Sequence, residues 1–105
     1  REFCWTSPTA KTILWHYNNE DVAKIKDTIF GFVPVIYGYV IRDISKMDGI
    51  KITYSDDSFI SCRFSGTESV IRIVVDADNE EKTNSILSIY SNNLKEILGD
   101  LVWEE

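Results

Sequence analysis

Apolar and polar residues alternate along five short stretches of the chain, which is the pattern of half-buried β-strands. β-Branched and aromatic residues are frequent in these stretches, as strands favour. The pattern predicts strands at 12–17, 35–45, 49–54, 59–64 and 70–77. A tight polar turn at 55–58 joins the third and fourth of them.

Helical spacing follows the first predicted strand. Val22, Ile25 and Ile29 lie on one helical face, after a polar run at 18–21 that offers Asn as cap and acids for the first turn. Gly31 and Pro34 end this helix.

A second helix is predicted from 78–81 to residue 98. Asp78 precedes Glu81 by three residues, which is the spacing of a capping box, and Gly99 ends the helix. Its apolar stripe consists of Leu87, Tyr90, Leu94, Ile97 and Leu98.

The resulting order, β-α-β-β-β-β-α, predicts an α+β fold with a mostly antiparallel sheet and two helices. A length of 105 residues with 44% hydrophobic residues suits one domain over 1–105. Because the chain starts at Arg1 and its single methionine is Met47, we expect it to be cut from a longer polypeptide.

Charge limits the partners. The net charge of −6 weighs against nucleic acid and anionic membranes, so a bound anion must be held by a local arrangement of donors. There is no apolar run near 18 residues and no signal-peptide pattern, which makes the cytoplasm the expected location. Cys4 and Cys62 lack metal-ligand spacing; a reduced setting is the simpler interpretation, and a Cys4–Cys62 bridge stays open.

One turn in this acidic chain is flanked by two arginines. Alternation places Ser61 and Arg63 on one face of their strand, opposite the apolar residues, and Arg72 likewise leaves the apolar side of the next strand. If these strands flank one turn, both guanidinium groups can converge near 65–67, the Ser-Gly-Thr of that turn.

The chemistry of this turn suits phosphate. Gly66 lets successive N–H groups point into one concavity, and the hydroxyls of Ser65 and Thr67 add donors. Arg63 and Arg72 supply planar forks that match phosphate oxygens. An ordinary hairpin turn with solvent-facing arginines accounts for the same residues, and spacing alone does not decide between the two.

The run "RFSGTESVIRIVVDAD", preceded by "DGIKITYSDDSFI", resembles the C-terminal domain (domain 4) of the α-D-phosphohexomutases, which include phosphoglucomutase, phosphomannomutase and phosphoglucosamine mutase. The resemblance covers roughly residues 6 to 98, is specific at 48 to 78, and implies a fold of the TATA-binding-protein type. It implies that Arg63, Ser65, Gly66, Thr67 and Arg72 hold the substrate phosphate that is not being transferred. Glu68 is then expected to shape the turn, and Ser69 departs from the family's usual proline and costs rigidity.

Family membership implies an isomerase that exchanges phosphoryl groups between a phosphoserine and a hexose phosphate. The sequence has no match to the family's phosphoserine segment or to its Asp-rich Mg²⁺ loop. We therefore expect no catalysis by this chain alone, Mg²⁺ in the full-length enzyme, and partners that are a hexose phosphate and the parent's other domains. The alternative from another class is a stand-alone protein-interaction or nucleic-acid-binding module. The acidic charge argues against binding to DNA.

Other candidate residues have structural interpretations. A calcium loop counted from Asp76 fails, because its sixth and twelfth positions are Glu81 and Leu87. His16 is predicted to be a packed or edge histidine, and Cys62 a core residue rather than a nucleophile. The three tryptophans are expected in the core or on a surface that packs against a neighbouring domain; they are Trp5, Trp15 and Trp103.

Overall fold

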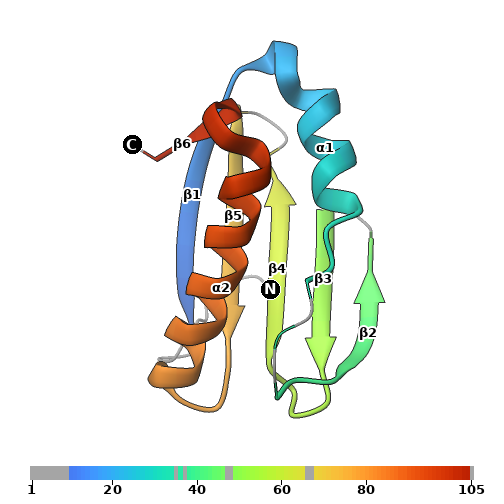
Figure 1. Ribbon diagram of the computed structural model, residues 1–105, viewed down its shortest axis with the longest axis vertical. Coiled ribbons are helices and arrows are strands. Elements are labelled where there is room, and N and C mark those ends of the chain that lie inside the picture. The colour runs from blue at the N-terminus through green and yellow to red at the C-terminus, as the bar shows by residue number, and fades with distance from the viewer. Residues whose placement is uncertain (1–9, 35, 37, 47–48, 66–67, 105) are drawn as a thin grey trace.

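The computed structural model describes residues 10–34, 36, 38–46, 49–65 and 68–104. Its α-helices are α1 (Val22–Phe30) and α2 (Glu80–Leu98), with 3₁₀ turns at Asn19–Asp21 and Gly99–Leu101 (Figure 1). Its strands are β1 (Lys11–Tyr17), β2 (Ile41–Ser45), β3 (Gly49–Tyr54), β4 (Phe59–Phe64), β5 (Val70–Asp76) and β6 (Val102–Trp103).

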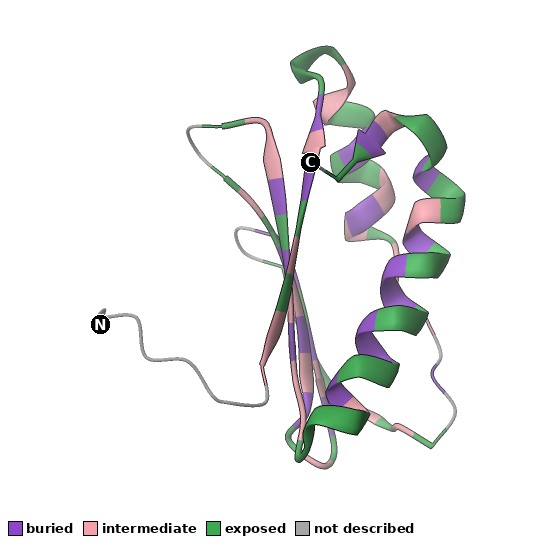
Figure 2. Cartoon of the chain, turned by 90° about the vertical axis from the view of Figure 1, so that its left-hand side faces the viewer, coloured by how far each residue is buried: buried purple, intermediate pink, exposed green. Residues whose placement is uncertain are grey.

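The strands form one six-stranded sheet in the order β2-β3-β4-β5-β1-β6, and every neighbouring pair is antiparallel. Both helices lie on the same side of this sheet, and none of the described residues forms a helix over its other face (Figure 2). The α+β class predicted from the sequence is confirmed. We call the face without helices the uncovered face; the candidate site lies on it.

The core lies between the helices and the sheet. Alternate residues of β4 and β5 point into it and are fully buried, whereas the residues between them are exposed or half-buried. The α2 stripe supplies the other wall, with Tyr90 and Leu94 fully buried. Burial of these apolar side chains is the main stabilising term of such a two-layer fold. Ile97, expected in this stripe, is instead 57% exposed.

The second predicted strand is too long. We expected strand over 35–45, but β2 begins at Ile41. Gly38 has φ +88, a left-handed conformation outside the strand region, and the Tyr39 N–H donates to the Ile36 carbonyl in a turn. Residues 35 and 37 lie outside the described part of the chain. At the other end, the two-residue strand β6 was not expected, because two residues carry no readable alternation.

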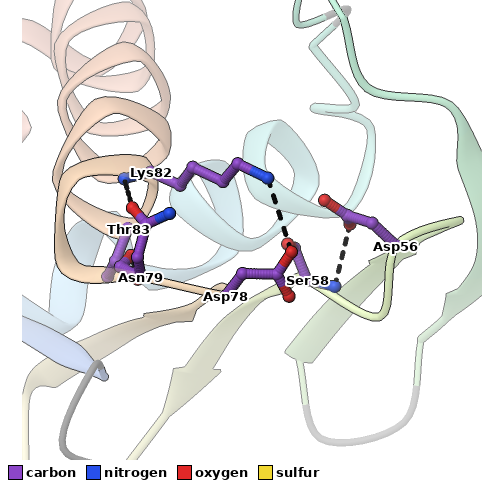
Figure 3. A network of polar contacts seen from close by, with 6 residues as sticks. All are labelled: Asp56, Ser58, Asp78, Asn79, Lys82 and Thr83. Atoms are coloured by element: carbon purple, nitrogen blue, oxygen red, sulfur yellow. Dashed lines mark hydrogen bonds and ion pairs between the residues drawn. The ribbon is translucent and has the colours of Figure 1, made fainter.

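The cap of α2 also differs from the expectation. Asn79, not Asp78, is the N-cap: its Oδ1 accepts from the Lys82 N–H at 2.8 Å (Figure 3). The Asp78 carboxylate instead pairs with Lys82 Nζ at 3.4 Å. Although the sequence offered an Asn cap at 18–21, no side-chain cap forms at Asn18, which precedes the 3₁₀ turn, or at Asp21, which precedes α1.

Asp56 closes the turn between β3 and β4, next to this cap (Figure 3). Its Oδ1 accepts from the Ser58 N–H at 3.0 Å. Partial burial alone would raise the pKa of the Asp56 carboxyl, but the hydrogen bonds from Ser58 and the charge of Lys82 outweigh it, so the pKa lies below its ordinary value. This polar cluster lies at the start of β4. Arg63 lies near the other end of that strand, and Arg72 lies near the start of β5.

Candidate functional site

Arg63 and Arg72 lie directly opposite each other on the paired strands β4 and β5. Both side chains are exposed on the uncovered face, because their chain neighbours Cys62, Ile71 and Ile73 are buried on the helix side. Cα atoms of directly opposed residues are only about 5 Å apart. Alternation predicted that the two positively charged side chains lie on the same face of the sheet. The strand register shows that they are also direct cross-strand neighbours.

The two arginines line a single hollow of about 630 Å³ on the uncovered face. We call it the arginine hollow. It lies over the ends of β4 and β1 and the start of β5, and includes Glu104, which follows β6. Its lining residues are Leu14, His16, Arg63, Phe64, Ser65, Glu68, Val70, Arg72 and Glu104.

Ser65 starts the turn that bounds this hollow. Its N–H donates to the Val70 carbonyl at 3.0 Å, and its Oγ accepts from the Glu68 N–H at 3.2 Å. The serine hydroxyl oxygen thus shapes the turn, as hydroxyl side chains do, and Glu68 takes part through its main chain. Gly66 and Thr67 lie outside the described residues, so the nest of their N–H groups stays a prediction.

Ser69 ties the far side of the turn to a distant part of the chain. Its Oγ donates to Asn19 Oδ1 at 2.6 Å, and its carbonyl accepts from the Tyr17 N–H at 3.1 Å. Where we expected the replacement of proline to cost rigidity, the serine hydroxyl supplies an anchor of its own. No local pattern could have indicated this contact, since the two side chains are 50 positions apart.

His16 forms part of the wall of the arginine hollow. It lies in β1, pairs with Val70 on one side and Trp103 on the other, and stacks on the Trp103 ring at 6.3 Å between centroids. The packed histidine of our prediction is therefore confirmed, but its place beside the arginines was missed. Trp103 is 41% exposed, Trp15 is buried in the core, and Trp5 lies outside the described residues.

Cys62 lies in the core, directly before Arg63. It is a free thiol and fully buried, and this burial raises its pKa to about 12, against a smaller opposing effect of the neighbouring Tyr90 side chain. The protonated thiol cannot act as a nucleophile near neutral pH. The prediction of a core residue is confirmed.

No three His, Cys, Asp or Glu side chains gather in the described residues to hold a metal ion. No helix among the described ranges is both long and apolar enough to span a bilayer.

Comparison with known proteins decides the family. Residues 18–88, a range that contains both arginines, match the model of the phosphoglucomutase/phosphomannomutase C-terminal domain. The chain belongs to this family. It represents the family's C-terminal domain, in agreement with the resemblance inferred from the Arg-x-Ser-Gly-Thr run.

Curated relatives agree with this assignment. A probable phosphoglucosamine mutase of Pyrococcus horikoshii is 33% identical over 84 residues, which is 80% of this chain and 18% of that protein. A probable phosphoglucosamine mutase of Methanosphaera stadtmanae is 38% identical over 58 residues, 55% of this chain and 13% of that protein. The chain thus spans less than a fifth of the length of these relatives.

Proposed function

We propose that this phosphohexomutase C-terminal domain holds the phosphate of a hexose phosphate that is not being transferred. Arg63 and Arg72 grip the phosphate oxygens, and Ser65, Gly66 and Thr67 supply donors from the turn. The observation that carries the proposal is the placement of the two arginines, which oppose each other and line one hollow on the uncovered face.

The electrostatics favour an anion between the arginines. Two like charges directly opposite each other on a sheet repel. A phosphate dianion placed between the two guanidinium groups attracts both of them and offsets this repulsion. Hydrogen bonds to charged groups contribute about 1.5–3 kcal/mol each, less where solvent screens them. The site is local, because a net charge of −6 repels an anion at long range.

In this proposal the domain binds and orients, and the phosphoryl transfer takes place elsewhere in the parent enzyme. Energy gained by holding a remote phosphate can position the reacting end of the sugar. The parent's other domains, its phosphoserine and its Mg²⁺ belong to the proposal as partners. The relatives' names favour a hexosamine phosphate as substrate. The family match favours this role over a stand-alone interaction module, and the free Cys62 thiol supports a reducing, cytoplasmic setting.

The test is a titration of the ¹⁵N-labelled chain with inorganic phosphate and with glucose 1-phosphate, followed by amide chemical shifts. The expected shifts centre on residues 63–72. Arg63→Ala should weaken binding at least about tenfold, the loss of one charge-assisted contact, and keep a dispersed spectrum, because its side chain is exposed. Arg42→Ala is the matched control, an exposed arginine on β2 paired with Asp57. Equal binding by wild type and Arg63→Ala contradicts the proposal.

A further inference from the structure

The turn that bounds the arginine hollow is attached to the sheet on both sides. On one side, the Ser65 N–H donates to the Val70 carbonyl at 3.0 Å, which extends the pairing of β4 with β5 by one residue. On the other side, the Tyr17 N–H donates to the Ser69 carbonyl at 3.1 Å, one residue beyond the last β1–β5 pair, which is His16 with Val70. The base of the turn is therefore held by backbone hydrogen bonds to β1 as well as within the β4–β5 hairpin.

A side-chain hydrogen bond ties Ser69 to a segment outside the sheet. Its Oγ donates to Asn19 Oδ1 at 2.6 Å, within the usual range for a hydroxyl donor. Asn19 begins the 3₁₀ turn that leads into α1, and the Asp21 N–H donates to the Asn18 carbonyl in that turn at 2.9 Å. Because α1 is packed into the core through its buried isoleucines, Asn19 gives Ser69 a second point of attachment beyond β1.

Ser69 lies between two residues that line the arginine hollow, Glu68 and Val70. Glu68 is also attached to Ser65, because its N–H donates to the Ser65 Oγ at 3.2 Å. Ser65 lines the hollow too, and Arg72 follows Val70 by two positions along β5. A displacement of Ser69 would therefore be passed to the described residues on this side of the hollow.

We infer that Asn19 and Ser69 are positioning residues for the phosphate site, and that their hydrogen bond holds the turn in its binding conformation before phosphate arrives. The inference rests on the proposed function, since it needs phosphate to bind at this turn. Neither residue lines the hollow, so neither is expected to touch the phosphate. If the turn is held for only part of the time, its affinity for phosphate falls by the fraction of time spent in the binding conformation.

The same coupling acts in the opposite direction. Coupling free energies are reciprocal, so phosphate that stabilises the turn also stabilises the hydrogen bond to Asn19. Amide shifts induced by phosphate should therefore extend from the hollow to residues 18–21, none of which lines it. If the Ser69 hydroxyl only stabilised the fold, its removal would not abolish the phosphate-induced shifts at 18–21.

The test is a titration of the ¹⁵N-labelled chain with inorganic phosphate at constant ionic strength, carried out on wild type, Ser69→Ala, Asn19→Ala and the double variant. Each single variant should bind phosphate about two- to tenfold more weakly, the effect of one neutral hydrogen bond, and the double variant should bind no more weakly than either. Because Asn19 is exposed and Ser69 is half-buried, all variants should keep dispersed spectra.

Two further variants complete the design. Ser69→Thr keeps the hydroxyl and should bind phosphate as wild type does, whereas in Ser69→Ala the phosphate-induced shifts at 18–21 should disappear. Asn93→Ala is the control, since it removes an exposed asparagine from α2 on the other side of the sheet and should leave the affinity unchanged.

The outcomes separate this inference from the proposed function. If Arg72→Gln weakens phosphate binding while Ser69→Ala and Asn19→Ala bind as wild type does, the positioning role is refuted and the phosphate role stands. Additive losses in the double variant also refute the positioning role, because the two side chains would then act through separate contacts. If Arg72→Gln and wild type bind phosphate equally, the proposed function is refuted, and this inference with it.

Discussion

Arg72→Gln is expected to move stability and binding in opposite directions. In the absence of phosphate, the change removes the repulsion between two directly opposed arginines. Opposed like charges destabilise a sheet by about 0.2–1 kcal/mol, so the free energy of unfolding should rise by an amount within that range. No lost contact should offset this increase in the free energy of unfolding, because the Arg72 side chain forms no ion pair or hydrogen bond among the described residues.

Binding should fall at the same time. Loss of one charge-assisted contact to phosphate costs about 1.5–3 kcal/mol, or roughly ten- to 150-fold in affinity, with solvent exposure favouring the lower end. Saturating phosphate should consequently stabilise wild type by more than the variant, since a ligand that binds the folded state adds stability according to its affinity.

The assay is urea unfolding of both proteins with and without phosphate, followed by tryptophan fluorescence at constant ionic strength. Arg42→Gln serves as the reference, because it breaks the ion pair with Asp57 and should lower the free energy of unfolding by up to about 1 kcal/mol. The reasoning is refuted if Arg72→Gln is less stable than wild type without phosphate, or if phosphate stabilises the variant as much as wild type.

Three further outcomes are expected. Gly49→Ala should lower the free energy of unfolding by about 1–3 kcal/mol, since the added Cβ meets backbone atoms that must shift; urea unfolding measures this, and an unchanged midpoint contradicts the close approach. Cys62, with its pKa raised to about 12, should react with iodoacetamide at pH 8 only after unfolding, and fast labelling at Cys62 itself, as distinct from Cys4, would show that the buried thiol is accessible in the folded chain. Because the folded pKa of Asp56 is lowered, its contribution to stability is present above its unfolded pKa of about 3.9 and is lost as pH falls through the folded pKa. In Asp56→Asn, the free energy of unfolding should therefore fall less steeply at acidic pH than in wild type. An unchanged fall would count against the Ser58 hydrogen bonds as the cause of the lowered Asp56 pKa.

The sequence was most informative where a side chain's position depends on local alternation. The strands around Arg63 and Arg72 were predicted to within one residue, and so was the face to which each arginine belongs. Their direct opposition was not predicted, because register depends on how the strands pair and not on which residues alternate.

Non-local features of the site could not be predicted. The wall formed by Leu14 and His16 exists because β1 pairs with β5, more than 50 positions away, and alternation within β1 does not reveal its neighbour. Glu104 joins the arginine hollow only because β6 pairs with the end of β1. The error at 35–45 has a different origin. The β-branched and aromatic residues there favour a strand, but Gly38 adopts a positive φ, which a glycine permits and which composition alone does not predict.

The arginines are anchored on β4 and β5, the two innermost strands of the six. Each strand is paired along both edges and buries alternate side chains in the apolar core, so its backbone is held firmly at these positions. If the proposed function holds, a sugar phosphate bound by these arginines can be reoriented only by side-chain rotation or by displacement of the domain as a rigid body. Under the proposed function, admission and release of substrate in a parent mutase would depend on the joints between its domains, and substitutions at those joints would alter turnover without touching a phosphate ligand.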